Sequence, residues 1–253
     1  MSRTILGKTQ IDEIENKFKA SDDTPIFRYM DFSKFMDLLE NKHLFFCNAQ
    51  YFEDEYEGKI PEGFYKGWSK EARDGHEPLS EMINEYFKGY ISCWNKGEVE
   101  SYSLWKIYTN PNTGIAIKST VGDLKKALDN HSIKMYKAEY VDFKEKEVDC
   151  EPPCYSREVA NENGLMITRD VVEVYKDMPY AYENEIRAVY ITNIEKNGIN
   201  FGINLSTLIN EIYISPFASE WFDKLVHKIA KKECYNISDK PICKSEIRLR
   251  KNA

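Results

Sequence analysis

The stretch "TPIFRYMDFSKFMDLLENKHLFFCNA" (Thr24–Ala49) passes through three hydrophobic patterns in succession. Residues 24–30 form a short apolar run typical of a strand, and residues 32–42 carry apolar side chains at helical spacing, with Ser33 near the helix start. Residues 43–49 return to a strand-like run. The segment therefore predicts a strand, a helix and a second strand.

The rest of the chain continues this mixture without repeats or a clear linker. We expect helices over residues 11–20, 101–108, 121–130, 156–177 and 219–233, and a helix that runs into a strand over 77–94. Strands are expected over 113–119, 133–143, 185–191, 198–203 and 210–215. In the last helix, the expected buried face is Trp221, Leu225, Val226 and Ile229. This irregular order favours an α+β fold. We expect a single domain over 1–253, with a helical extension at 1–24, a core at 25–235 and a tail at 236–253.

Composition limits the classes of function. The 253 residues are 42% hydrophobic and 30% charged, which is typical of a globular protein, and the net charge of -7 argues against a protein that coats duplex nucleic acid. No run of about 18 apolar residues predicts a membrane span, and the N-terminal stretch does not resemble a secretion signal. We therefore expect reduced cysteines, no membrane partner and a cytoplasmic location. The spacings of Cys150, Cys154, Cys234 and Cys243 lack a CxxC pair, so no metal is expected.

The stretch "AYENEIRAVYI" (Ala181–Ile191) carries charges at alternate positions. In a strand, Glu183, Glu185 and Arg187 would share one face. Two interpretations stand at this point: the outward face of an edge strand with ordinary salt bridges, or a group of charges gathered for chemistry.

Several common motifs are missing. "LGKT" (Leu6–Thr9) lacks the glycine that a phosphate-binding P-loop needs five residues before Gly7, and the chain has no GxGxxG, GxSxG or HExxH. The acidic run "YFEDEYEG" (Tyr51–Gly58) has two interpretations. It is either a solvated turn or helix start, or a divalent-metal site made by Glu53, Asp54, Glu55 and Glu57.

Four motifs together resemble a bacterial family known as domain of unknown function 2971. They are "IFRYM" with the helix, strand and "YFEDEYEG" that follow; "YISCWNKGEVESYSLWKIYTNPNTGIAIKS"; "YENEIRAVYI"; and "INEIYISPFASEWF". They resemble that family's FNDPFEG, LMWxxY and E-x-E-x-R motifs and its closing strand and helix, from about Pro25 to about Phe222. The family name implies no activity.

A more distant resemblance is to the ADP-ribosyltransferases. The shared features are an arginine on a first strand (Arg28), a serine on a middle strand (Ser92) and a late E-x-E (Glu183 and Glu185). The resemblance implies split, mostly antiparallel β-sheets with flanking helices and with NAD, as substrate, in the cleft between them. It also implies transfer of ADP-ribose from NAD to a macromolecular acceptor, either a nucleic acid or a protein.

The residue types suit this chemistry. Cleavage of the nicotinamide–ribose bond passes through an oxocarbenium-like state, which the carboxylate of Glu185 would stabilise. Glu183 would remove a proton from the acceptor, and Arg187 would orient Glu185 or moderate the repulsion. Arg28, next to Tyr29, would hold phosphate or ribose oxygens, with Ser92 as a further cofactor contact.

Trp105 and Tyr108, three residues apart on a short helix, would stack on a flat ring, or would simply pack in the core. Small bacterial proteins of this kind resemble toxins of toxin–antitoxin or antiphage systems, which implies an antitoxin partner. Two other functions stay open: a non-enzymatic module that binds a nucleotide or a protein, and a metal-dependent nuclease built on the acidic run.

Overall fold

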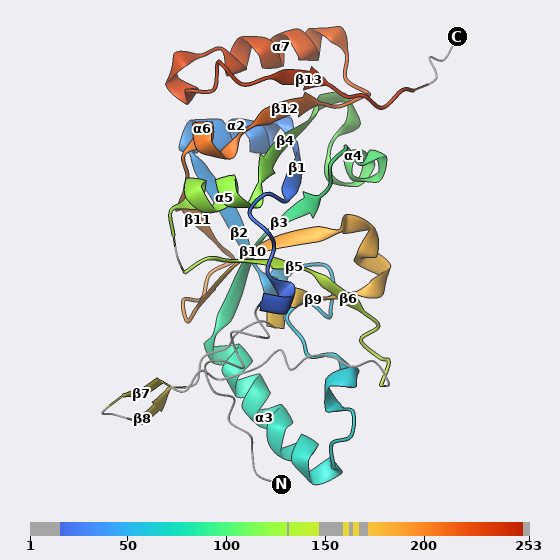
Figure 1. Cartoon of the computed structure of the whole chain (residues 1–253), viewed down its shortest axis with the longest axis vertical. Coiled ribbons are helices and arrows are strands. Elements are labelled where there is room, and N and C mark those ends of the chain that lie inside the picture. Colours follow the sequence, from blue (N-terminus) through green and yellow to red (C-terminus); the bar gives the residue numbers. More distant parts are fainter. Residues whose placement is uncertain (1–15, 131, 147–158, 162–163, 167–171, 250–253) are drawn as a thin grey trace.

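The computed structural model describes residues 16–130, 132–146, 159–161, 164–166 and 172–249. Its main sheet contains nine strands, and all their pairings are antiparallel except that of the last two. They are β1 (Pro25–Asp31), β2 (His43–Asn48), β3 (Lys88–Lys96), β4 (Gly114–Thr120), β5 (Lys134–Lys137), β10 (Glu185–Thr192), β11 (Gly198–Gly202), β12 (Glu211–Ile214) and β13 (Ile242–Lys244). Figure 1 shows β3 and β10 crossing the middle of the molecule.

The sheet forks at β3. A strand has two edges, and β10 pairs with β3 along eight consecutive residues, from Lys88 to Asn95. β1 and β2 therefore share the other edge: β1 pairs with Asn95 and Lys96, whereas β2 pairs with Tyr90 and Ile91. The three residues between these pairings, 92–94, have register partners only on β10 among the described residues. From the fork, β1 continues to β4, β12 and β13, and β2 continues to β11. This geometry confirms the expected α+β fold with split, mostly antiparallel sheets.

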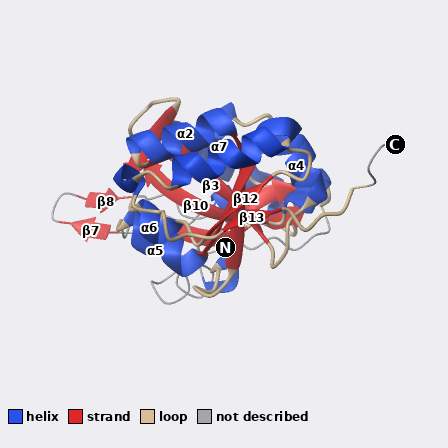
Figure 2. Cartoon of the chain, turned by 90° about the horizontal axis from the view of Figure 1, so that it is seen from above, coloured by secondary structure: helices blue, strands red, loops and turns tan. Residues whose placement is uncertain are grey.

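The helices are α2 (Phe32–Asn41), α3 (Lys70–Tyr86), α4 (Tyr102–Tyr108), α5 (Val121–Leu128), α6 (Leu205–Leu208) and α7 (Glu220–Ala230). Four of them, α2, α5, α6 and α7, pack on one face of the sheet. The largest core joins apolar residues of α2, α5, α6 and α7 to alternate residues of the strands, because these helices each carry one apolar stripe. Figure 2 shows α2 and α7 close together, and the rings of Phe32 and Phe222 pack edge to face at 5.3 Å.

A smaller core lies on the other side of β1 and β4. It contains Phe27, Trp105 and Ala116, and it packs α4 against β1. Ser101 caps α4 by accepting a hydrogen bond from the backbone N–H of Leu104 at 3.4 Å. This core fixes the position of α4 beside the fork.

Most of the expected elements are confirmed, and three predictions are wrong. The helix expected over 156–177 is replaced, in its described part, by β7 (Val159–Asn161), β8 (Gly164–Met166), a 3₁₀ turn over Val172–Val174 and β9 (Tyr175–Asp177). The long strand expected over 133–143 breaks into β5 and β6 (Glu139–Val141), and β6 pairs with β9. Trp221 is 61% exposed, and α7 buries Phe222 in its place.

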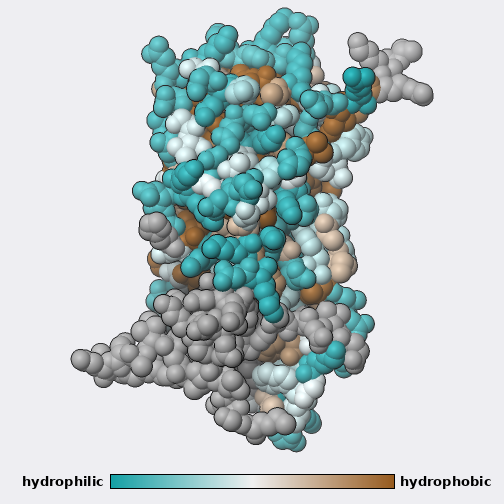
Figure 3. All heavy atoms as spheres, in the orientation of Figure 1, coloured by the Kyte–Doolittle hydropathy of each residue, from teal (hydrophilic) through white to brown (hydrophobic). Residues whose placement is uncertain are grey.

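The ends of the chain differ in part from the expected boundaries. Residues 16–18 are helical, and the remainder of the helix expected over 11–20 lies largely outside the described residues. Within the segment expected to be a tail, β13 pairs with β12 and Ile237 is fully buried. Among the described residues, no helix is both long enough and apolar enough to cross a membrane. The coloured part of the face in Figure 3 is largely hydrophilic, with hydrophobic atoms in small separate patches.

Candidate functional site: a cleft at the fork of the sheet

A cleft of about 670 Å³ lies at the fork. Its walls come from β1, α2, β2, β3, α4, β9 and β10, so it lies where β1 and β2 separate from the edge of β3. Its volume is within the range of small-molecule sites. The predicted residues that line it are Arg28, Tyr29, Tyr108, Glu183 and Glu185.

Arg28 projects from β1 into the gap on β3. Its Nη1 donates to the hydroxyl of Ser92 and, at 3.5 Å, to the carbonyl of Cys93. The guanidinium also lies 5.6 Å from the centre of the Trp94 ring. Burial lowers the pKa of Arg28. Among the described residues, no carboxylate forms an ion pair with it, so this cation is free to bind an anion.

Glu185 begins β10 and is 7% exposed. Its Oε1 accepts from Nζ of Lys176 at 3.1 Å, and its Oε2 accepts from Nε of Arg187 at 2.6 Å. The backbone N–H of Glu185 donates to the hydroxyl of Tyr140. Burial alone would raise the pKa of Glu185, but the positive charges of Arg187 and Lys176 together hold this pKa at about 2. The carboxylate is therefore ionised at every physiological pH.

Glu183 lies beside Glu185 but does not belong to the same strand. It ends the 3₁₀ segment Met178–Glu183, and Asn184 follows in the left-handed conformation with φ of 43°. The prediction that strand alternation aligns Glu183 with Glu185 is therefore wrong, although the turn still brings the two carboxyls together. Lys176 Nζ donates to Oε2 of Glu183 at 2.6 Å, and the hydroxyl of Tyr108 donates to Oε1.

The pKa of Glu183 moves in the opposite direction to that of Glu185. Burial raises it, and the hydrogen bond and charge of Glu185 raise it further. Three carboxyls, on Glu57, Glu183 and Glu185, here contact only two cations, on Lys176 and Arg187. Two carboxyls whose surroundings push their pKa values apart can divide acid–base work between them.

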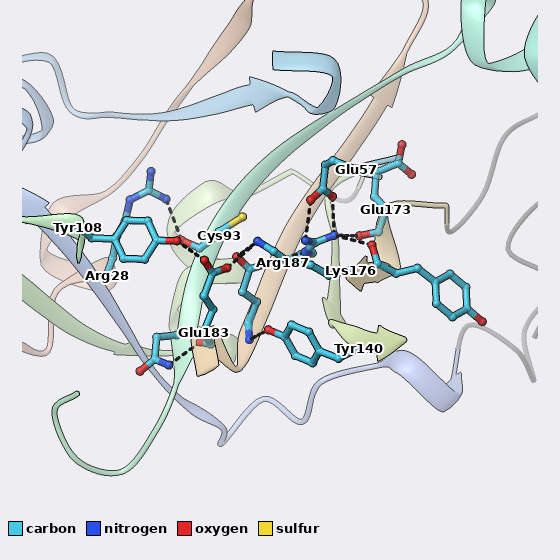
Figure 4. A network of polar contacts seen from close by, with 12 residues as sticks. Arg28, Glu57, Cys93, Tyr108, Tyr140, Glu173, Lys176, Glu183 and Arg187 are labelled. Atoms are coloured by element: carbon cyan, nitrogen blue, oxygen red, sulfur yellow. Dashed lines mark hydrogen bonds and ion pairs between the residues drawn. The ribbon is translucent and has the colours of Figure 1, made fainter. Parts of the chain in front are cut away.

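Arg187 is completely buried and connects the cleft to the acidic run (Figure 4). Its Nη1 and Nη2 donate to the two carboxylate oxygens of Glu57 at 2.7 and 3.0 Å. Nη1 also donates to the backbone carbonyl of Glu173 at 2.5 Å. β10 lies between β3 and β5, so the interpretation of these charges as a solvated edge-strand face is wrong. Through its Nε, Arg187 also contacts Glu185.

The aromatic residues divide between the cleft and its supporting wall. Tyr108 is 43% exposed and lines the cleft. Trp105 is fully buried: its Nε1 donates to Glu100 at 2.8 Å and its ring packs edge to face on Tyr29. Tyr29 accepts a hydrogen bond from the backbone N–H of Ser101 at 2.7 Å. The structure therefore brings Tyr108 and Tyr29 to the cleft and places Trp105 in the core behind it.

Sequence reasoning missed Lys176 and named Glu57 only as a ligand of the alternative divalent-metal site. Glu57 is the last glutamate of the "YFEDEYEG" phrase, so the motif was a signal. The segment does form a turn with Glu53 and Glu55 exposed, but the interpretation as solvated residues is wrong for Asp54 and Glu57, which are 8% and 7% exposed. Lys176 lay within the wrongly expected helix and carried no signal. Both oxygens of Glu57 are bound by Arg187, and the described carboxylates of the run form no group that could hold a metal ion.

Comparisons with known proteins give limited matches. The model of a family described as a protein of unknown function (DUF2971) matches residues 104–188, which confirms the resemblance to that family over this part of the chain. No curated protein matches the sequence.

Two solved structures are similar to this protein in the path of the backbone. One is DarT of Thermus sp. 2.9 in complex with carba-NAD+, with 13% identity and a TM-score of 0.40, covering 90% of this chain and 98% of the other. The second is the same protein with ADP-ribosylated single-stranded DNA, with 12% identity, a TM-score of 0.41, and coverage of 90% and 97%. Both scores indicate a loose likeness.

Proposed function

We propose that the cleft binds NAD and that the protein transfers ADP-ribose from it to a macromolecular acceptor. The observation that carries the proposal is convergence: Arg28 on β1 is hydrogen-bonded to Ser92 on β3, and the cleft that Arg28 lines also contains Glu185 of β10. A guanidinium that forms no ion pair with a described carboxylate suits the pyrophosphate, and an ionised carboxylate suits the ribose at which positive charge develops.

The proposed reaction breaks the bond between the ribose C1′ and the nicotinamide nitrogen. Nicotinamide leaves as a neutral molecule with the bonding electron pair, and the acceptor nucleophile forms a new bond to C1′. Glu185 stabilises the oxocarbenium-like state between these events. Lys176 and Arg187 occupy one site on each of its oxygens, but a carboxylate has about four acceptor sites, so a ribose hydroxyl can still donate to it.

Glu183 is the proposed base that receives the acceptor's proton. Its raised pKa makes it a better proton acceptor, once ionised, than Glu185. The hydroxyl of Tyr108, a residue that is 43% exposed, donates to Glu183 and would help to place the acceptor.

The acceptor in this proposal is a nucleic acid or a protein. We further propose that the protein acts in the cytoplasm as a toxin of a toxin–antitoxin or antiphage system and is neutralised by an antitoxin protein. Growth arrest on expression of the natural chain, and normal growth with Glu185→Gln, would support this role. Equal growth with both chains would count against it.

The test uses NAD labelled in the adenylate phosphate. The protein is incubated with a cell lysate, and the label is followed into fractions digested with nuclease or protease. We expect label transfer and nicotinamide release with the natural chain and neither with Glu185→Gln. Glu211→Gln, on β12 outside the cleft lining, is the matched control and should keep full activity. A folded natural chain that releases no nicotinamide and transfers no label would overturn the proposal.

A second candidate is a module that binds a nucleotide without reaction. The observation in its favour is that both oxygens of Glu185 already have cationic partners, as a purely structural ion network would. The two candidates differ in a single measurement. A module binds NAD and leaves it intact, whereas the enzyme releases nicotinamide.

A further inference from the structure

The strands β2 and β11 form the far side of the cleft, two strands away from β10. In their register, His43 lies opposite Gly202, Phe45 opposite Asn200, and Cys47 opposite Gly198. His43, Phe45 and Cys47 share one face of β2, because strand side chains alternate, and all three line the cleft. Leu44 and Phe46, on the opposite face, are buried in the main core.

Phe45 is a large apolar side chain held in an exposed position. It is 46% exposed, and its ring lies where a side chain at position 198 would be: a Cβ on Gly198 would stand 2.1 Å from Cζ of the ring. The glycine thus lets the ring lie against the backbone of β11, and the rest of the ring remains open. Such a supported, exposed ring is the arrangement on which flat heterocycles stack.

Phe45 and Glu185 lie on the same face of the sheet. Cys47 pairs with Ile91, Cys93 pairs with Arg187 and Asn95 pairs with Glu185, and directly opposite residues share a face. Two strand spacings, roughly 10 Å, separate β2 from β10. Arg28 contacts β3 between them, at Ser92 and Cys93. Arg28 starts from the opposite face of β1, because Phe27 pairs with Asn95, but it reaches through the gap at the edge of β3 and lines the same cleft as the carboxylates and the ring of Phe45.

We propose that Phe45, supported by Gly198, is the stacking platform for the adenine ring of NAD. This inference rests on the proposed function in one respect: if the bond to nicotinamide breaks at Glu185 and the pyrophosphate lies on Arg28, the adenine is the part that reaches β2. The acceptor must approach the carboxylates, so the platform, two strands away, is not its contact.

Asn200 adds a polar group to the same platform. It is exposed, lines the cleft and lies directly across from Phe45, where opposite Cβ atoms are about 4.5–5.5 Å apart. Its amide carries two donors and one acceptor oxygen, so it can bond the edge of a purine whose face lies on the ring.

The experiment measures the binding of AMP, ADP-ribose, NAD and nicotinamide mononucleotide by titration calorimetry. For Phe45→Ala we expect affinity for the three adenine-containing ligands to fall by roughly tenfold or more. Affinity for nicotinamide mononucleotide, which has no adenine, should stay within twofold. Phe45→Trp keeps a flat ring and should retain binding. Tyr86→Ala removes an aromatic residue that is 59% exposed outside the cleft lining, and should change nothing.

Gly198→Ala provides a second variant that keeps the ring. The added Cβ forces the ring of Phe45 to move, so adenine affinity should also fall, whereas Gly202→Ala, with open space around position 202, should not affect it. The platform would be overturned if the natural chain and Phe45→Ala bound the adenine-containing ligands with equal affinity. It would also be overturned if Phe45→Ala lost as much affinity for nicotinamide mononucleotide as for these ligands, or if the natural chain bound neither AMP nor ADP-ribose. AMP binding that depends on Phe45, in a protein that never releases nicotinamide, would overturn the proposed function and leave the platform standing.

Discussion

Arg28 and Ser92, 64 residues apart in the chain, are hydrogen-bonded across the fork of the sheet. The contact exists because β1 leaves the edge of β3 after Phe27, so the arginine reaches residues of β3 that no strand of the described chain covers on that side. A conventional sheet would have paired those residues and left no opening. The fork therefore creates the cleft and lets the guanidinium of Arg28 line it.

Removal of that cation should separate binding from stability. Because burial lowers the pKa of Arg28 and no described carboxylate pairs with it, Arg28→Gln should leave the free energy of unfolding unchanged within about 1 kcal/mol, or raise it. Affinity for NAD should fall about 10- to 100-fold, as expected for a lost charged hydrogen bond. Urea unfolding and calorimetric titration measure the two quantities. A destabilised variant with normal NAD affinity would show that the arginine is structural.

Glu57 should matter for folding although it lies outside the expected chemistry. Glu57→Ala removes both acceptor oxygens from the buried guanidinium of Arg187, which should lower the free energy of unfolding by about 3–5 kcal/mol. The exposed neighbour Glu55, changed to Ala, is the matched control and should shift it by less than about 0.5 kcal/mol. Similar urea midpoints for the two variants would contradict the ion pair.

The acid sensitivity of the fold should depend on Glu185. Its pKa is about 2 in the folded protein against an ordinary value of 4.5, so its contribution, roughly 3 kcal/mol, is present above pH 4.5 and is lost as the pH falls towards 2. The melting temperature of Glu185→Gln should therefore change less with pH over this window than that of the natural chain. An unchanged slope would mean that the carboxylate is not held by Lys176 and Arg187.

The contribution of Glu183 to stability should depend on pH in the opposite direction to that of Glu185. A carboxyl whose pKa is raised on folding contributes stability below its unfolded value, and that contribution is lost as the pH rises through the folded pKa. Glu183→Gln, which imitates the protonated form, should therefore be at least as stable as the natural chain at pH 7, whereas Glu185→Gln should be less stable. Melts of both variants at pH 7 test this order, and a reversed order would contradict the division of roles.

Tyr108 should set the pH dependence of the proposed reaction. Its hydrogen bond lowers the pKa of Glu183, so Tyr108→Phe should raise that pKa and move the acidic limb of the rate profile to higher pH. Tyr102→Phe, on the same helix and 50% exposed, is the control. The measurement is nicotinamide release against pH. A lower rate with an unshifted profile would assign Tyr108 to binding alone.

The sequence alone was sufficient for the order of the principal elements. The apolar run of β1, the helical spacing of α2 and the strand pattern of β10 all appear in the chain, because these patterns reflect which side of a single element is buried. The resemblance to known families added Arg28, Ser92, Glu183 and Glu185 as one set, and three of these residues line the cleft while Ser92 contacts one of them.

The tertiary structure decided which charges meet. Glu57 and Arg187 are 130 residues apart, and Lys176 lies in a segment whose apolar residues suggested a helix, so no local pattern could pair them. The same holds for Trp105 and Trp221, whose exposure depends on the element that packs beside them. Hydrophobic periodicity is a property of one element, whereas the stability of a buried charge depends on partners brought together by the whole fold.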